Sequence, residues 1–271
     1  MVGKSVLGLF AMAAIMLLAG CIQVQQKNGR ASSSAESTIS GEARELNGVQ
    51  KVFFTTEDGF RIAGDLYEPR QPNGRAIVLL HIFNKSKETW REFALGLQQR
   101  GWTALAIDLR GHGESTEQNG GRRVVQEFSE KDFQSMVLDA KAAKKLLEEK
   151  EAENKINVEK IFVAGASIGA NTALNYCVGD PSLAGVVLLS PGLNYKGIST
   201  EESTGECKTP VFLAASGEDE YSFQSSQAIF EKLGDKRDSV FEQLQDAGHG
   251  TTMLAARPSL AKKIVEWMES Q

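Results

Sequence analysis

Three kinds of side chain in this sequence could together perform nucleophilic catalysis. Ser167 lies in the motif Gly-Ala-Ser-Ile-Gly at 165–169, and its hydroxyl is a candidate nucleophile. A serine hydroxyl needs a base to take its proton, and histidine has the pKa that suits this task at neutral pH. The chain has only three histidines, His81, His112 and His249. The sequence therefore predicts a serine activated by one of these imidazoles.

His249 is the candidate base because of its place in the chain. It lies in Asp-Ala-Gly-His-Gly at 246–250, directly after the last strand-like run, and the flanking glycines leave room for an imidazole. His81 ends an earlier strand-like run, and His112 lies in the loop after the next one. A loop after the last strand of such a sheet reaches back toward the serine, so we predict that His249 takes the proton.

The base needs a carboxylate that holds its tautomer and stabilises the imidazolium. The strand-like run 211–214 is followed by Ala-Ser-Gly-Glu-Asp-Glu-Tyr at 215–221, which offers three acids. We predict Asp219 as the partner of the histidine, with Glu220 as the alternative. The position of this acidic segment between serine and histidine in chain order favours a catalytic role over that of a solvated loop.

The elements around the serine predict a sharp turn at the edge of a sheet. The apolar run 160–164 is typical of a short buried strand, and 168–177 is typical of a helix. A serine between them lies at a helix N-terminus with its hydroxyl exposed. Glycines flank it because strand and helix approach too closely there for larger side chains.

Apolar strand-like runs alternate with helical runs along most of the chain. The predicted strands are 51–56, 60–67, 76–80, 103–107, 161–164, 185–189, 211–214 and 240–244, and the predicted helices are 90–97, 129–151, 168–177, 223–233 and 260–268. The first two strands form a hairpin through Glu-Asp-Gly at 57–59. The others predict a mostly parallel sheet of an α/β protein, with helices on both faces and ligands at the carboxyl ends of the strands.

These motifs together resemble the α/β-hydrolase family. The serine turn, the acid after the penultimate strand and Gly248-His249 occur in the family's order, and Asp-Leu-Arg-Gly-His-Gly-Glu-Ser at 108–115 resembles its segment after the fourth strand. The resemblance covers residues from about 50 to the end and implies an α/β-hydrolase fold with eight strands. It also implies transfer of an acyl group to water through a covalent ester on Ser167.

The same resemblance implies an oxyanion site made by the backbone N–H groups of Ile168 and Phe83. Family members commonly carry His-Gly-x where this chain has His81, Ile82 and Phe83. Asp108 and His112 are interpreted as structural residues that tie the loop beside the site.

The leading hypothesis is a hydrolase of carboxylic esters, with a small-molecule or acyl-ester substrate. About twenty residues, 190–209, separate two strands, so we expect no large cap domain and a site open to solvent. An aminopeptidase-like or thioesterase-like activity would use the same residues, and a non-catalytic binding lipoprotein is a further alternative, favoured by Ile82 at the glycine position.

Composition excludes other classes of function. The formal net charge is −5, and the scattered Lys and Arg residues argue against nucleic acid as a partner. The three histidines lack the paired spacing of zinc sites, and no glycine-rich phosphate loop is present. We therefore expect no metal, no cofactor and a monomer.

The N-terminal segment predicts export and lipid attachment. Residues 1–20 carry Lys4 and then an apolar run typical of a signal peptide. The run ends in Leu-Ala-Gly-Cys at 18–21, which resembles the lipobox of bacterial lipoproteins and implies a lipid on Cys21. Residues 21–47 are polar and predict a flexible tether before a domain at 48–271. The protein is thus expected in a bacterial cell envelope, anchored by lipid, with the outer membrane favoured because Ile22 replaces an aspartate.

Two further cysteines, Cys177 and Cys207, are predicted at the far side of the sheet from the serine. A disulfide between them and two free thiols are both compatible with the sequence.

Overall fold

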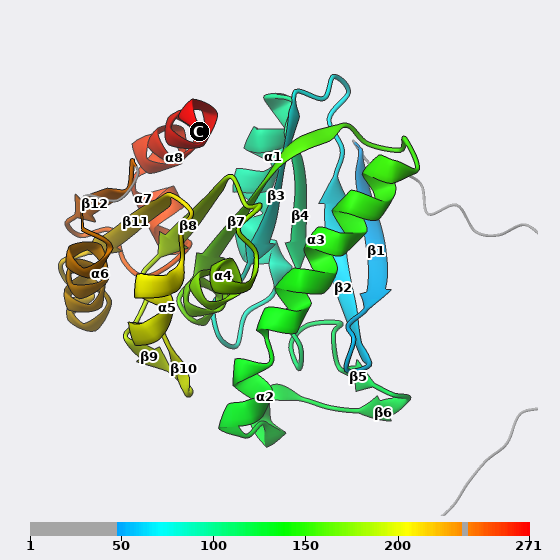
Figure 1. Cartoon of the computed structure of the whole chain (residues 1–271), viewed down its shortest axis with the longest axis horizontal. Helices are drawn as coiled ribbons and strands as arrows, with labels where there is room; N and C mark the ends of the chain where they lie inside the picture. The colour runs from blue at the N-terminus through cyan, green and yellow to red at the C-terminus, as the bar shows by residue number, and fades with distance from the viewer. Residues whose placement is uncertain (1–47, 235–237) are drawn as a thin grey trace, which may run out of the picture. The chain divides into compact units, whose positions relative to one another are not determined.

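A sheet of ten strands forms the centre of the computed structural model, which describes residues 48–234 and 238–271. Its order is β12-β11-β8-β7-β3-β4-β2-β5-β6, with β1 beside β2 (Figure 1). The strands are β1 (Val49–Thr55), β2 (Phe60–Tyr67), β3 (Gly74–Leu80), β4 (Thr103–Ile107), β5 (Glu117–Gln118), β6 (Gly121–Arg122), β7 (Val158–Ala166), β8 (Gly185–Leu189), β11 (Val211–Ser216) and β12 (Val240–Leu244). From β4 to β12 through β3, β7, β8 and β11, every pairing is parallel.

The eight predicted strands are present, and β1 and β2 form the predicted antiparallel hairpin. The predicted number of strands was too low, because β5 and β6 add a two-residue hairpin at the edge beside β2. These short strands are mostly exposed and polar, so they show no alternation of apolar and polar residues that a sequence pattern could reveal.

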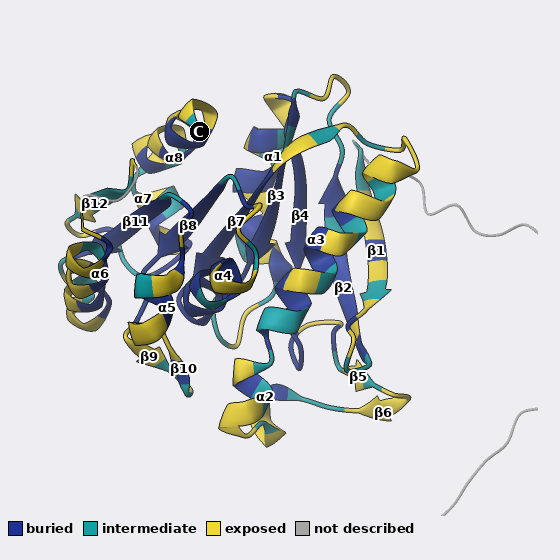
Figure 2. Cartoon of the chain, viewed as in Figure 1, coloured by how far each residue is buried: buried dark blue, intermediate teal, exposed yellow. Residues whose placement is uncertain are grey.

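Helices cover both faces of the sheet, as predicted. The helices are α1 (Arg91–Gln99), α2 (Glu130–Gln134), α3 (Val137–Ala152), α4 (Ile168–Gly179), α5 (Glu201–Glu206), α6 (Glu220–Leu233), α7 (Thr252–Ala256) and α8 (Pro258–Ser270), with 3₁₀ turns at Lys87–Trp90 and Val125–Glu127. One apolar cluster joins the sheet to α3, α4 and α6, and a second joins the other face to α1, α7 and α8. Figure 2 shows the result: the strands in the middle of the sheet are buried, the outer strands β1, β6 and β12 carry exposed residues, and the helices expose their outer sides.

The helix predicted over 129–151 is two helices, α2 and α3. Its start is as predicted, since Ser129 and Asp132 form a reciprocal capping box. The helix ends at Gln134, and the Ser135 hydroxyl and backbone N–H both donate to the carbonyl of Lys131 at this end. The break allows both Phe133 and Met136 to be buried in the core.

A small extension follows β8 at the carboxyl edge of the sheet. Residues 191–207, called the arm below, contain the hairpin of β9 (Asn194–Tyr195) and β10 (Ile198–Ser199) and then α5. In Figure 1, β9 and β10 lie in the same lower part of the molecule as α2. The described residues contain no large cap domain, as predicted, but the hairpin itself was not predicted.

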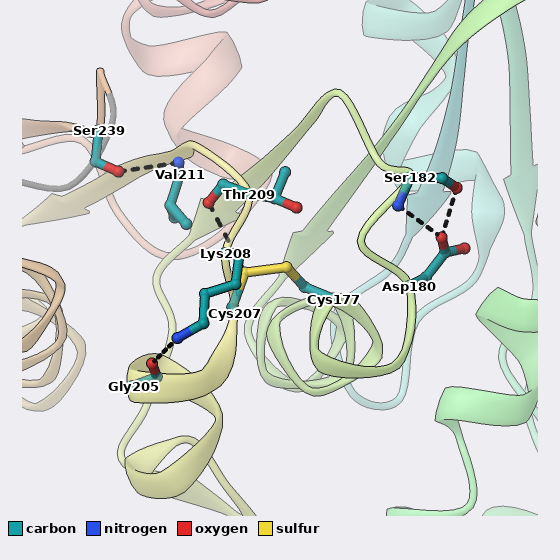
Figure 3. Close-up of a disulfide and its surroundings, with 9 residues drawn as sticks. All are labelled: Cys177, Asp180, Ser182, Gly205, Cys207, Lys208, Thr209, Val211 and Ser239. Carbon is teal, nitrogen blue, oxygen red and sulfur yellow. Dashed lines mark hydrogen bonds between the residues drawn. A yellow bond between two sulfur atoms is a disulfide. The ribbon is translucent and has the colours of Figure 1, made fainter.

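A disulfide joins the end of the arm to α4. Cys177 and Cys207 are bonded, with an S–S distance of 2.01 Å and Cα atoms 5.4 Å apart. Figure 3 shows this bond between the last turns of α4 and the segment that leaves α5. Of the two alternatives left by the sequence, the structure contains the disulfide.

The predicted signal peptide, the lipidation site Cys21 and the tether to residue 47 lie outside the described residues. In the part of the chain that is described, none of the helices combines the length and the apolar character needed to cross a membrane.

Candidate active site

Ser167 lies on a strained turn between β7 and α4. Its φ is 56° and its ψ is −121°, a conformation that costs a residue other than glycine about 1–3 kcal/mol. The two glycines of the motif make the turn possible. A Cβ on Gly165 would lie 2.0 Å from the carbonyl oxygen of Gly169, and one on Gly169 would lie 2.4 Å from the carbonyl oxygen of Leu80. The close approach predicted for the serine turn is therefore present.

The serine is less exposed than the sequence indicated. Ser167 is only 6% exposed, and the arm brings the Tyr195 side chain to its hydroxyl. An open site was expected from the short connection at 190–209, but the hairpin in that connection is held against α4 by hydrogen bonds to Asn171. The structure therefore corrects the expected solvent exposure of Ser167, whereas its predicted position on the turn is unchanged.

His249 and Asp219 are in direct contact. The distance from His249 Nδ1 to Asp219 Oδ2 is 2.5 Å, whereas Glu220 accepts a hydrogen bond from Gln224 in its own helix. A carboxylate accepts only, so Nδ1 carries the proton and Nε2 keeps a free lone pair. Burial raises the pKa of Asp219, but hydrogen bonds from His249 and Ser222 outweigh it and leave that pKa below its ordinary value. The acid is therefore charged at neutral pH.

An exposed acid next to Asp219 holds the loop that carries His249. Glu218 accepts hydrogen bonds from the backbone N–H groups of Asp246, at 2.9 Å, and Gly248, at 2.5 Å. The Ser216 hydroxyl donates to the same carboxylate at 2.5 Å. The bonds from Ser216 and Gly248 lower the pKa of Glu218 to about 2. In the sequence, Glu218 is one of three neighbouring acids, and no local pattern assigns it a role different from the other two.

The remaining N–H groups of the loop also donate to side chains. Ala247 donates to Ser216 Oγ at 3.0 Å, His249 to Thr252 Oγ1 at 2.9 Å, and Gly250 to Ser190 Oγ at 2.9 Å. A Cβ on Gly250 would lie 3.4 Å from the Ala166 Cβ, so the loop packs against the residue that precedes the serine. The loop after the last strand thus reaches the serine turn, as expected.

His81 holds the turn from which the second oxyanion donor was predicted. It is fully buried, its Nε2 accepts from Leu109 N at 2.9 Å, and its Nδ1 donates to the carbonyl of Ile82 at 2.7 Å. Burial and the neighbouring His112 lower the pKa of His81 to about 3, so the ring is neutral. In a trans peptide the N–H opposes the C=O, so the N–H of Phe83 points away from the side of the peptide bonded by His81.

The first predicted donor lies at the other side of the serine. Ile168 is the first residue of α4, and an N–H in the first turn of a helix has no acceptor within the helix. Such groups are available to a developing negative charge at the helix N-terminus.

Asp108 ties its loop to the 3₁₀ turn at Lys87–Trp90, and His112 contacts the backbone of its own loop. Asp108 accepts from the N and Nζ atoms of Lys87, at 2.8 and 3.0 Å, and from Glu114 N at 2.9 Å. His112 Nδ1 bonds to the carbonyl of Arg110 at 2.9 Å, and burial lowers the pKa of its ring. These contacts match the structural interpretation of both residues.

No metal site is found where the structure can be described. Residues 48–234 and 238–271 contain no group of three or more His, Cys, Asp or Glu side chains placed to hold an ion.

Sequence comparison finds a family model that matches the part of the chain around the serine turn. The family model for serine aminopeptidases, S33, matches residues 71–200, which include Ser167 but end before Asp219 and His249. A polyketide transferase from Stachybotrys chlorohalonatus is 31% identical over 147 residues, which are 54% of this chain and 46% of the relative. The chain therefore spans about half the length of this curated relative.

Solved structures show the fold. An esterase from Pyrococcus furiosus is 20% identical with a TM-score of 0.66, over 82% of this chain and 90% of that one. A dienelactone hydrolase from Anabaena variabilis is 19% identical with a TM-score of 0.63, over 82% and 98%. A carboxyl esterase from Bacillus coagulans is 15% identical with a TM-score of 0.63, over the same shares.

The predicted α/β-hydrolase fold is thus confirmed. The family model and the fold together support an α/β-hydrolase enzyme.

Proposed function

We propose that this protein hydrolyses carboxylic esters through an acyl-enzyme on Ser167. The observation that carries this proposal is the 2.5 Å contact between His249 Nδ1 and Asp219 Oδ2, in a loop that packs against the serine turn. An imidazole oriented by a carboxylate, in a loop that packs against a serine on a sharp strand-to-helix turn, is an arrangement suited to nucleophilic catalysis.

In the first half of the reaction, His249 Nε2 takes the Ser167 proton as Oγ bonds to the acyl carbon. The carbonyl electron pair moves onto oxygen, and the N–H groups of Ile168 and Phe83 stabilise that charge, each by about 3 kcal/mol. The ester C–O bond then breaks, and the imidazolium returns its proton to the leaving alcohol. Asp219 keeps the imidazole in the required tautomer throughout.

In the second half, water replaces the alcohol. His249 takes a proton from water as the water oxygen bonds to the acyl carbon. The bond between that carbon and Ser167 Oγ then breaks, the imidazolium returns its proton to Oγ, and the acid is released. No step needs a metal ion or an organic cofactor.

An aminopeptidase is the second candidate, because the matching family model is that of serine aminopeptidases. Such an enzyme binds the free ammonium group of its substrate. Lys196 lies with its Nζ 5.1 Å from the Phe83 ring, at the predicted oxyanion turn, and like charges repel. The carboxylate of Asp219 already contacts His249. These charges favour a neutral or negatively charged ester over an amino-terminal peptide.

The test compares ester, thioester and amide substrates that share one acyl group. We expect kcat/KM to be highest for the esters and hydrolysis to disappear in Ser167→Ala. Faster release of an amino-terminal residue from a peptide would replace the proposal with the aminopeptidase. No hydrolysis of any substrate would favour a binding protein on the same fold.

We propose further that a lipid on Cys21 anchors the mature protein to a bacterial membrane, with the outer membrane as the favoured site. The support is the sequence alone, an apolar run that ends in Leu-Ala-Gly-Cys at 18–21. Expression in a bacterium with a labelled fatty acid should label the protein, and Cys21→Ser should abolish the label. A labelled Cys21→Ser variant would contradict the anchor, and membrane fractionation would test its location.

A further inference from the structure

The arm brings a tyrosine hydroxyl close to Ser167 and, through Ser222, to His249. Tyr195 Oη lies 2.9 Å from Ser222 Oγ, and Ser222 Oγ lies 3.5 Å from His249 Nδ1. The Ser167 hydroxyl also interacts with the Tyr195 hydroxyl. The mechanism proposed above uses neither Tyr195 nor Ser222, although both touch its residues.

The helix that begins after the nucleophile holds the arm in place. Asn171, four residues after Ser167, donates from Nδ2 to the carbonyl of Ile198 at 2.8 Å and accepts from Gly192 N at 2.9 Å. Asn171 is fully buried, so these bonds are shielded from water. The hairpin that carries Tyr195 is therefore fixed relative to the serine turn.

A second contact fixes the Tyr195 ring. It packs edge-on against Tyr221, with ring centroids 5.5 Å apart, and the Tyr221 hydroxyl donates to the carbonyl of Asn194 at 3.0 Å. A Cβ on Gly192 would lie 2.7 Å from the Tyr195 ring, so glycine leaves the space that the ring occupies.

Tyr195 remains protonated at neutral pH. Burial and the nearby Asp219 charge raise its pKa above the ordinary value, and these effects outweigh the hydrogen bonds to Ser222 and Ser167, which lower it. A protonated phenol can donate a hydrogen bond to a substrate.

We propose that the Tyr195 hydroxyl is a further catalytic group, which donates a hydrogen bond to the leaving-group oxygen of the ester. This inference rests on the proposed esterase function. The hydroxyl interacts with the Ser167 hydroxyl itself, and Ser222 links it to His249 at Nδ1, the ring atom that Asp219 also contacts. The leaving oxygen must lie within reach of both Ser167 and the imidazolium Nε2, which protonates it. The predicted oxyanion donors come instead from the start of α4 and the turn after β3.

Tyr195 neither gains nor loses a proton when the alcohol leaves. Oγ of Ser167 has bonded to the acyl carbon, and the proton on His249 Nε2 passes to the leaving oxygen as the C–O bond breaks. Tyr195 keeps its own proton and stabilises the negative charge that develops on that oxygen. The stabilisation matters most for an alkoxide, which holds its charge poorly, and least for a nitrophenolate, which delocalises it.

The test compares two acetate esters, ethyl acetate and 4-nitrophenyl acetate, in Tyr195→Phe. Because both give the same acetyl-enzyme, kcat/KM isolates the step in which the alcohol leaves. We expect kcat/KM to fall about tenfold for the ethyl ester and no more than about twofold for the nitrophenyl ester, since one hydrogen bond is lost from one transition state. Equal losses on both esters, or no loss on either, would overturn the assignment.

Two matched variants separate the hydroxyl from general effects. Tyr176→Phe removes a phenol hydroxyl that bonds to Asp180 at the far end of α4, and both esters should react as in the wild type. Tyr221→Phe loosens the arm but keeps the Tyr195 hydroxyl. A selective loss on the ethyl ester in Tyr221→Phe as large as that in Tyr195→Phe would assign the effect to the arm and overturn the proposal.

Labelling with a fluorophosphonate distinguishes a failure of the Tyr195 proposal from a failure of the proposed esterase function. It reports on the activated serine and needs no alcohol leaving group. A wild-type protein that labels, together with a Tyr195→Phe variant whose ester preference is unchanged, overturns this inference alone. A wild-type protein that does not label overturns the proposed function as well.

Discussion

At the scale of single residues, the position of His249 is set by hydrogen bonds from its loop to neighbouring side chains. Five successive backbone N–H groups, from Asp246 to Gly250, donate to side-chain oxygens. A loop held in this way has few alternative conformations, so the imidazole needs little reorganisation during the reaction. Its Nδ1 then meets Asp219, which selects the tautomer.

Asp219→Asn tests the choice of acid. An amide can donate to Nδ1 and so stabilise the wrong tautomer, and we expect kcat to fall on the order of 10³–10⁴-fold. The matched control is Glu220→Gln, one residue along the chain, whose carboxylate bonds to Gln224. Ester hydrolysis by both variants is the measurement. A large loss in Glu220→Gln with a small one in Asp219→Asn would assign the acid to Glu220.

Glu218→Gln tests the acid that holds the loop. A glutamine keeps one acceptor oxygen in place of two, so one of the three hydrogen bonds to Glu218 is lost. We expect kcat to fall about tenfold with little change in KM, because the imidazole is misplaced while substrate binding is not. Glu92→Gln, an exposed acid in α1, serves as the control. A change in KM alone would contradict a positioning role.

The same variant predicts a dependence on pH. The pKa of Glu218 is lowered from 4.5 to about 2, so its stabilising contribution is complete above pH 4.5 and is lost as pH falls toward 2. The unfolding midpoints of wild type and Glu218→Gln should differ at pH 6 and converge near pH 2. A difference that grows on acidification would have the wrong sign.

At the scale of elements, the serine turn depends on how closely α4 approaches β3. A Cβ on Gly169 would lie 2.4 Å from the Leu80 carbonyl oxygen and 2.7 Å from that of His81. These atoms are backbone, so they cannot move aside cheaply. The arm is a second such element, because Asn171 ties it to the same helix.

Gly169→Ala should destabilise the protein by about 1–3 kcal/mol, since α4 must move away from β3. The matched control is Gly179→Ala in the last turn of the same helix, where a Cβ meets nothing within 4 Å. That variant should be neutral or slightly stabilising. Denaturant unfolding measures both, and equal stabilities would show that the helix does not depend on the close approach.

The disulfide makes a separate prediction. Cys177 and Cys207 are 30 residues apart, and breaking the bond frees this loop in the unfolded chain. The double serine variant should lose about 2–4 kcal/mol of unfolding free energy. A reductant should destabilise the wild type and leave the double variant unaffected. A wild type indifferent to the reductant would contradict a stabilising bond.

At the scale of the whole molecule, the alternation of apolar and helical runs predicted the mostly parallel sheet, and the resemblance of the motifs to a known family implied the α/β-hydrolase fold. The eight long strands repeat a clear apolar pattern, but the two-residue strands β5, β6, β9 and β10 are too short to show one. Tyr195 was missed because it lies in the short strand β9 and because its contact with Ser222 is tertiary, which no local sequence pattern shows. The choice between Asp219 and Glu220 needed coordinates, because only the start of α6 decides which carboxylate faces His249.

Peptide mapping after treatment with a fluorophosphonate tests the central claim most directly, because the reagent forms a stable adduct only with an activated nucleophile. We predict one adduct per chain, on Ser167, which is absent in Ser167→Ala and forms on the order of 10³-fold more slowly in His249→Ala. No adduct on the wild type, or an adduct at another residue, would contradict the account.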